Sequence, residues 1–331
     1  MGNIVCFGEI LIDLLAQPPA SPEQPRAFLQ YAGGAPANVA VAAARLGVGT
    51  QFVGMLGRDM FGDFLADSLQ QHGVGTDFIA RTDAAKTALA FVALDAHGER
   101  SFSFYRPPAA DLLFRAADFQ AGCFDQASCF HVCSNSLTEA EIARTTFEGM
   151  QRARASGALV SLDLNLRPAL WPTDADPLPT LWQALELADV VKLSREELDY
   201  LAAPLGPQGA EQVLQRLLGA HARWVVVTDG AAPLQWHARD SRGQVESFSV
   251  PTVDSTAAGD AFVGGLLTAL VERGVDAAGL PAFCADPTAM RAVLRFGAAV
   301  GALAVTRKGA FAAMPSRAEV DALLQQPEET H

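Results

Sequence analysis

The chain is 331 residues long, half of its residues are apolar and 18% are charged, a composition typical of a folded protein that excludes a disordered one. The formal net charge is -13, and because an acidic surface repels phosphate-rich polymers and lipids, nucleic acid and anionic membranes are not expected as partners. A chain of this length can form one large α/β domain or two smaller ones.

Short strand-like apolar runs alternate with helical patterns along most of the chain. The expected elements, in chain order, are a buried strand at 4–8, a helix at 37–46 ended by Gly47, a strand at 50–56, a helix at 61–72 ended by Gly73, strands at 158–163 and 189–192, a helix from Ser194, a helix at 208–220 and a strand at 223–228. Strands separated by helices indicate βαβ units. We therefore expect a mostly parallel sheet with helices on both faces.

Two segments depart from this alternation and predict a second, antiparallel sheet. Residues 87–94 and 100–106 alternate with period two, and the turn sequence Asp95-Ala96-His97-Gly98 lies between them. Residues 11–16 and 27–31 predict two more strands of the same kind. A small sheet that projects from a parallel core could act as a lid over a ligand. The alternative is a surface hairpin without a function.

Known phosphate-binding loops are missing from the sequence. It contains no Gly-Lys pair, hence no Walker A loop, and neither of its Gly-x-Gly pairs continues into a Rossmann fingerprint. The strongest candidate is instead the segment Asp254-Ser255-Thr256-Ala257-Ala258-Gly259-Asp260, between a strand expected at 248–253 and a helix expected to run to about Arg273. Small residues at the start of a helix leave its first backbone amides open to an anion, which the helix dipole also favours.

Asp260 falls in the first turn of this helix, beside the expected anion site. A carboxylate there could take a proton from a hydroxyl while the amides hold the phosphoryl group that moves to it. The alternative is purely structural, with Asp254 capping the turn and Asp260 complementing the helix dipole. A second segment, Gly33-Gly34-Ala35-Pro36-Ala37-Asn38, is either a ligand loop or a tight strand-to-helix turn.

Taken together, these two segments resemble the motifs of the ribokinase, or PfkB, family of carbohydrate kinases. That family has an early Gly-Gly-x-x-x-Asn motif and a late Asp-Thr-x-Gly-Ala-Gly-Asp motif, and the likeness extends over nearly the whole chain. Within the family, the chain is most similar to bacterial fructokinases at 8–13, at 98–106 with Ala110-Asp111, and at 163–167. The resemblance implies one ribokinase-like domain over 1–331, with lid strands from about 11–33 and 87–106.

The resemblance also implies roles for individual residues. Asp260 would be the catalytic base, and Ala257, Ala258 and Gly259 would form the anion hole. The sugar would be bound by residues of both motifs, the lid and the segment around 167, namely Asp13, Gly33, Gly34, Asn38, Tyr105, Arg106 and Arg167. The nucleotide phosphates would be bound by Lys192, Thr228, Gly230 and Gly259.

Two ions accompany this chemistry in the family. Glu197 would organise Mg²⁺ through water, and a monovalent cation such as K⁺ would lie beside Asp254, Ala304 and Gly309. Three residues depart from the family pattern. Ala257 replaces a glycine, Ser194 replaces an asparagine three residues before Glu197, and Ala313 lacks a side-chain oxygen near the cation loop, so that K⁺ dependence is left open.

The activity expected from the resemblance is the transfer of phosphate from ATP to D-fructose, giving fructose 6-phosphate. A 2-keto-3-deoxygluconate kinase of the same family is the first alternative, because Tyr105, Arg106 and Arg167 could instead hold a carboxylate. A sugar- or nucleotide-binding protein without turnover is the second. The odd number of cysteines, five, and the lack of a recognisable signal peptide predict reduced thiols and a cytoplasmic location. A homodimer is expected through the lid.

Overall fold

The computed structural model describes residues 2–17, 21, 25–94 and 100–326. Its main sheet has nine strands in the order β13-β12-β11-β10-β9-β8-β1-β4-β5. All neighbouring strands from β11 to β5 pair in parallel, whereas β12 and β13 add an antiparallel edge. The strand bounds are Asn3–Phe7 (β1), Thr50–Gly57 (β4), Ile79–Thr82 (β5), Ala127–Cys133 (β8), Leu159–Asp163 (β9), Val190–Ser194 (β10), Trp224–Asp229 (β11), Ala232–Ala238 (β12) and Arg242–Val245 (β13).

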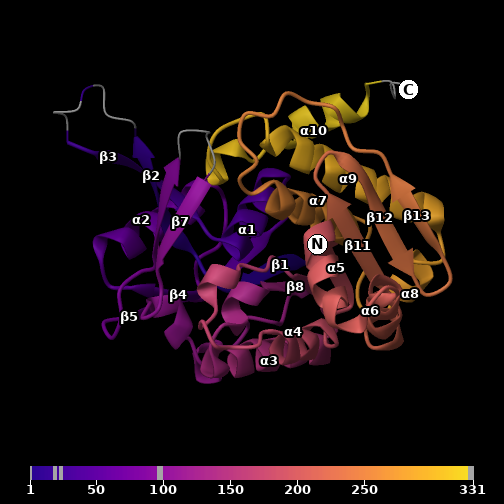
Figure 1. Cartoon of the computed structure of the whole chain (residues 1–331), viewed down its shortest axis with the longest axis horizontal. Coiled ribbons are helices and arrows are strands. Elements are labelled where there is room, and N and C mark those ends of the chain that lie inside the picture. The colour runs from indigo at the N-terminus through magenta and orange to yellow at the C-terminus, as the bar shows by residue number, and fades with distance from the viewer. Residues whose placement is uncertain (1, 18–20, 22–24, 95–99, 327–331) are drawn as a thin grey trace.

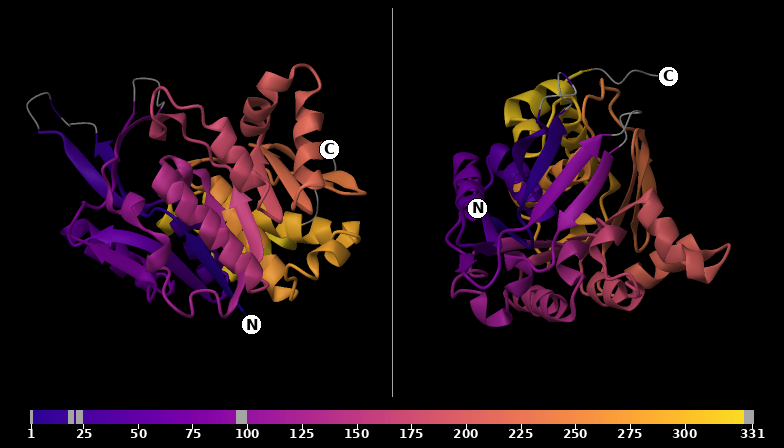
Figure 2. Two further views of the ribbon diagram at one scale, coloured as in Figure 1. Left: turned by 90° about the horizontal axis from the view of Figure 1, so that it is seen from below. Right: turned by 60° about the vertical axis from the view of Figure 1, so that its left-hand side comes forward.

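Helices cover both faces of this sheet, as the βαβ pattern predicts (Figures 1 and 2). One apolar core lies under α1 (Ala35–Arg45), α2 (Met60–Gln71), α7 (Ala258–Glu272), α8 (Leu280–Phe283), α9 (Pro287–Ala304) and α10 (Arg317–Leu324). The other core lies under α3 (Ala140–Ala155), α4 (Leu178–Leu185), α5 (Arg195–Ala202) and α6 (Gly209–Gly219). None of the helices described is long and apolar enough to cross a membrane.

The second sheet has four strands in the order β3-β2-β6-β7 and projects from the body of the molecule (Figure 2). Its strands are β2 (Leu11–Gln17), β3 (Ala27–Gly33), β6 (Leu89–Leu94) and β7 (Arg100–Tyr105). The strands β2 and β3 pair antiparallel, as do β6 and β7, and a parallel pairing of β2 with β6 joins the two halves. The four predicted strands are therefore confirmed, and the predicted turn at 95–98 lies outside the described residues.

One expected element is wrong. Residues 248–253 form no strand but an irregular segment before α7. The apolar side chains that suggested a strand do not belong to a sheet. The Phe248 ring lies under the Arg295 guanidinium, 5.0 Å from its carbon, and Val253 is 55% exposed. The Val253 amide donates to the Val305 carbonyl at 2.8 Å, so the segment is attached to the end of α9 rather than to a sheet.

The parallel strands point their carboxyl ends toward one edge of the main sheet. At that edge β1, β9, β10 and β11 end at Phe7, Asp163, Ser194 and Asp229. Ligands of α/β proteins bind outside the carboxyl ends of such strands, because the following loops and helix amino ends meet there. The topology therefore brings segments that are far apart in sequence to one candidate site.

Candidate active site

The amino end of α7 is preceded by a turn with a residue in the left-handed region. Ala257 has φ 59° and ψ 15°, where a Cβ costs free energy. Asp254 stabilises the turn, because its Oδ1 accepts from the Thr256 amide at 2.8 Å and its Oδ2 from the Gly309 amide at 3.1 Å. The first amides of a helix lack acceptors within the helix. This geometry suits the anion hole expected at residues 257–259.

Asp260 lies in the first turn of α7 and is buried. Its Oδ2 accepts a hydrogen bond of 2.8 Å from Nδ2 of Asn38, so the two motifs expected from the sequence meet directly. Burial and the negative charge of Asp163 raise the pKa of Asp260 to about 7, although the Asn38 hydrogen bond and the charges of Arg167 and Lys192 act in the opposite direction. A carboxyl group with a pKa near neutrality suits a general base.

Lys192 lies beneath the same turn. Its Nζ is 3.0 and 3.2 Å from the two carboxylate oxygens of Asp163. A Cβ at Gly259 would come within 3.1 Å of this Nζ, so the ammonium group adjoins the expected anion hole. Burial lowers the pKa of Lys192, but the charges of Asp163 and Glu197 outweigh this effect and raise it. Lys192 is therefore a cation beside the site.

The sequence reasoning missed Asp163 as a site residue, although it was part of a segment that resembles fructokinases. A signal was available, because Asp163 ends one predicted strand and Lys192 ends the next one along the chain. In the structure β9 and β10 are neighbours, and Asp163 pairs with Lys192 in their register. Polar residues at the ends of successive parallel strands meet at one edge of the sheet.

On the lid side, Asp13 and Gly33 lie against each other. A Cβ at Gly33 would come within 2.3 Å of Oδ2 of Asp13, so a larger residue would displace this carboxylate. Gly34 has φ 111°, and its missing side chain lets β3 turn into α1 beside the Glu9 backbone. The expected sugar-binding residues of both segments therefore line one corner between the lid and α1.

Contrary to expectation, Tyr105 does not face this corner. Phe104, not Tyr105, stands opposite the β6 residue that pairs with Asp13. Successive residues of a strand point to opposite faces of a sheet. The Tyr105 side chain is 65% exposed, and its ring packs against Phe91 with a centroid distance of 5.1 Å. The residue of this pair that shares a face with Asp13 is thus Phe104.

The two arginines expected near the sugar differ in their surroundings. Arg106 is buried, its Nε donates to Oδ2 of Asp111 at 2.7 Å, and its Nη2 donates to the Asn135 carbonyl at 2.7 Å. Its Nη1 is buried without a hydrogen-bond partner among the described residues. Arg167 is exposed, and its charge lowers the pKa of Asp260. Arg106 is therefore mostly engaged by protein groups, whereas the charge of Arg167 acts on Asp260.

The residues expected at the nucleotide lie at the ends of β10 and β11. Thr228 donates through Oγ1 to the Leu193 carbonyl at 3.4 Å, and Gly230 has φ 55° in the exposed turn that follows. Glu197 is occupied by protein amides, because its Oε1 accepts from Leu166 at 2.8 Å and its Oε2 from Ser194 at 2.7 Å. Each oxygen keeps a further lone pair for a water molecule.

Within the described ranges, no group of three or more His, Cys, Asp or Glu side chains could hold a metal ion alone. This donor set fits a Mg²⁺ ion that is carried by phosphates and water and reached by one or two carboxylates. For the monovalent cation, Asp254 and Gly309 are joined by a hydrogen bond and Ala304 ends α9 nearby.

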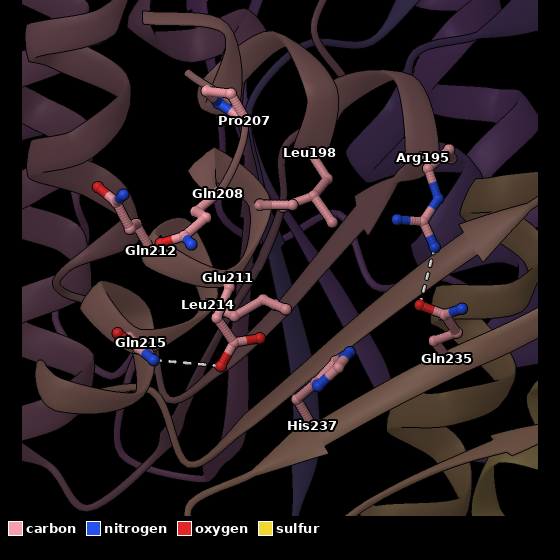
Figure 3. Close-up of a pocket in the computed structure, with 11 residues that line it drawn as sticks. Arg195, Leu198, Pro207, Gln208, Glu211, Gln212, Leu214, Gln215, Gln235 and His237 are labelled. Carbon is pink, nitrogen blue, oxygen red and sulfur yellow. Dashed lines mark hydrogen bonds between the residues drawn. The ribbon is translucent and has the colours of Figure 1, made fainter. Parts of the chain in front are cut away.

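A separate groove of about 670 Å³ lies between α5, the start of α6 and β12 (Figure 3). Arg195 donates to Gln235 across it at 2.8 Å, and Gln215 donates to Glu211 at 3.2 Å. Asp260 does not line this groove, and neither do the residues around it, namely Asn38, Asp163 and Lys192. The groove is therefore distinct from the candidate site at the start of α7.

Comparison with known proteins agrees with this geometry. Residues 1–317 match the model of the pfkB family of carbohydrate kinases. The chain is 40% identical to Fructokinase-1 of Oryza sativa subsp. japonica over 324 residues, 97% of each chain. Among solved structures, it is similar to a fructokinase with bound ATP from Xylella fastidiosa, with 61% identity, 98% coverage of both chains and a TM-score of 0.94.

A second solved structure extends the likeness to a complex with sugar. The fructokinase from Vibrio cholerae O395 in its fructose-, ADP- and calcium-bound form has 33% identity and a TM-score of 0.85, with 98% of this chain and 99% of that chain covered. The fold class predicted from sequence, a mostly parallel sheet flanked by helices with a small second sheet, is confirmed by these neighbours. The chain belongs to the pfkB family of carbohydrate kinases and is an ATP-dependent sugar kinase.

Proposed function

We propose that the chain transfers the γ-phosphoryl group of ATP to the 6-hydroxyl of D-fructose, with Asp260 as general base. The observation that carries the proposal is the meeting of Asn38 and Asp260 at the amino end of α7, with Lys192 beneath. Fructose is favoured because the relatives from rice, Xylella fastidiosa and Vibrio cholerae are fructokinases. The lid strands 11–33 and 87–106 would close over the sugar as part of one domain.

The mechanism follows from where the residues lie. Asp13 and Asn38 orient the sugar so that its hydroxyl points at Asp260, which accepts the proton as the new phosphorus–oxygen bond forms. The amides of Ala258 and Gly259 and the Lys192 ammonium stabilise the charge on the equatorial oxygens. Thr228 and Gly230 hold the other phosphates.

Mg²⁺ neutralises phosphate charge when it is bound with ATP, and Glu197 would reach it through water. A monovalent cation at Asp254, Ala304 and Gly309 would stabilise the turn that carries the anion hole. We further propose a cytoplasmic location, which the five free cysteines support because thiols stay reduced there.

The substrate is tested with a panel of sugars and keto-acids in a coupled assay of ADP release. Fructose should give a kcat/KM at least about tenfold above that of ribose, adenosine and 2-keto-3-deoxygluconate. A preference for the keto-acid would refute the fructose assignment and leave the kinase assignment intact. The engagement of Arg106 with Asp111 argues against the keto-acid, because that guanidinium is already paired with a carboxylate at 2.7 Å.

A further inference from the structure

The carboxylate of Glu9 is buried at the point where the main sheet passes into the lid. Glu9 lies between β1 and β2 and is 1% exposed. Its Oε1 accepts from the Ala35 amide at 3.0 Å and from Nδ2 of Asn135 at 2.8 Å. The Cys133 thiol is 3.6 Å from Oε2. One side chain thus joins the end of β1, the start of α1 and the segment after β8.

The backbones on either side of this carboxylate are in direct contact. A Cβ at Gly34 would come within 2.6 Å of the Glu9 carbonyl oxygen and 2.8 Å of Cα of Ile10. A Cβ at Gly8 would come within 2.8 Å of Cγ of Pro36. Residues 8–10 and 33–36 therefore form two turns that pack against each other, and the Glu9 hydrogen bond to Ala35 holds them together.

Each of these two turns is followed in the chain by a candidate sugar-binding residue. Asp13 lies on β2, four residues after Glu9, and its carboxylate lies over Gly33. Asn38 lies in the first turn of α1, where its amide donates to the Gly34 carbonyl at 2.8 Å and its side chain donates to Asp260. A shift of one turn against the other would change the distance between Asp13 and Asn38.

Glu9 also interacts electrostatically with Arg106, which follows β7 of the lid. Burial raises the pKa of Glu9, while the charge of Arg106 and the hydrogen bond from Asn135 lower it. Arg106 directly follows β7 and donates to the Asn135 carbonyl, so it is tied to the same segment as Glu9. A buried carboxylate is costly for a fold, and an apolar side chain would pack there without that cost. The presence of a carboxyl group at this junction needs another reason.

We propose that Glu9 is a positioning residue for the sugar, which sets the geometry of Asp13 and Asn38 by locking the 8–10 turn to the 33–36 turn. This inference deepens the proposed function and rests on it. Glu9 itself would make no contact with the sugar. Its effect should therefore appear in sugar affinity and in turnover with sugar, and not in the affinity for ATP, whose candidate residues lie at the ends of β10 and β11 and at the start of α7, outside the hydrogen bonds of Glu9.

The test compares Glu9→Met, which removes both acceptor oxygens at nearly the same side-chain length, with a matched control, Asp189→Leu. Asp189 is also a buried carboxylate that accepts a backbone amide, from Val160 at 2.9 Å, and pairs with an arginine, Arg154 at 3.0 Å. It directly precedes β10 and so lies at the amino ends of the parallel strands, whereas Glu9 follows the carboxyl end of β1. Both substitutions should lower the melting temperature. Glu9→Met alone should raise the KM and the calorimetric Kd for fructose by about tenfold or more, with the KM for ATP within about twofold of wild type.

The inference is overturned if Glu9→Met loses stability as Asp189→Leu does and keeps the wild-type Kd and KM for fructose. Should Glu9→Met not fold, Glu9→Asp shortens the side chain by one methylene and withdraws its acceptor from the Ala35 amide, and an unchanged fructose Kd in that variant would equally overturn the inference. Wild-type enzyme that does not phosphorylate fructose would instead refute the proposed substrate. The same variants are then compared with the sugar that wild type prefers, where the same shift is expected.

Discussion

Asp260 combines three properties that seldom occur together in a structural residue. It is buried, it accepts a hydrogen bond from a residue 222 positions away, and it adjoins a helix amino end. A sugar hydroxyl attacks poorly while it keeps its proton. Because the transition state of phosphoryl transfer is loose, the position of the base matters more than its strength.

Asp260→Asn should therefore abolish most turnover and leave sugar binding nearly intact. We expect kcat to fall by about 10²–10⁴ with little change in sugar affinity. Oδ1 of Asn38 has no partner among the described residues, so a flipped Asn38 amide can accept from the new amide and preserve packing. Steady-state kinetics and a melting curve on the same variant check this. A purely structural Asp260 would instead show about 1 kcal/mol lower stability and at least a third of wild-type kcat.

The pH dependence of activity should report the ionisation of Asp260. Its pKa is raised to about 7, and a base must be deprotonated, so kcat/KM for fructose should rise with pH and level off above about 7. Asp163 contributes to the raised pKa through its negative charge, so Asp163→Asn should move the midpoint to lower pH. A wild-type profile that is flat from pH 5 to pH 9 would contradict the assignment.

Ala257 carries backbone strain that a glycine would relieve. At φ 59° the Cβ is disfavoured, and Ala257→Gly should stabilise the protein by about 1 kcal/mol. Ala298 lies inside α9, where the same substitution should destabilise by about 0.5–1 kcal/mol. Urea unfolding of both variants gives the two signs. A loss of stability in Ala257→Gly would mean that the conformation of the turn is not limited by its Cβ.

At the scale of elements, the lid touches more than the sugar corner. Tyr31 of β3 lies against Gly309, where a Cβ would be 3.6 Å from the ring, and the Gly309 amide donates to Asp254. The lid therefore contacts the turn that stabilises the start of α7. Movement of the lid and the order of the anion hole should be linked through this contact.

Sugar should accordingly protect the lid from proteolysis. We expect fructose to slow cleavage within 11–33 and 87–106, because closure orders strands that otherwise form the edges of a small sheet. The exposed turn between β12 and β13 serves as an internal control, since it is remote from the lid (Figure 1). Mass spectrometry of the fragments locates the cuts. Equal cleavage of the lid with and without sugar would argue against closure.

For the whole molecule, the exposed face of the lid predicts self-association. Phe28, Phe91 and Tyr105 form an aromatic row, with centroid distances of 5.3 and 5.1 Å, and Leu29 on the opposite face is 46% exposed. Exposed apolar rows and unpaired sheet edges are commonly covered by a second copy. Light scattering at micromolar concentration should give about twice 34.9 kDa. Tyr105→Glu should shift the mass toward the monomer, and a strictly monomeric wild type would refute lid pairing.

The sequence by itself determined part of the helices and strands, and the family. The period of apolar residues places the helices and strands within a few residues, because each pattern depends on neighbours along the chain. The segments 33–38 and 254–260 carried the resemblance to the family, since small residues before a helix and a carboxylate in its first turn are local features, whereas the local pattern alone left a purely structural role open. The failed strand at 248–253 shows the limit of this reasoning. An apolar run looks the same whether it pairs in a sheet or lies along a helix end.

Only the tertiary structure decided how distant residues meet. The hydrogen bond between Asn38 and Asp260 and the ion pair between Lys192 and Asp163 depend on strand order. The register of β6 and β7 decided that Tyr105 points away from Asp13, because a shift of one residue reverses the faces of a strand. Burial decided the raised pKa of Asp260, since the desolvation of a carboxyl group depends on every element packed around it.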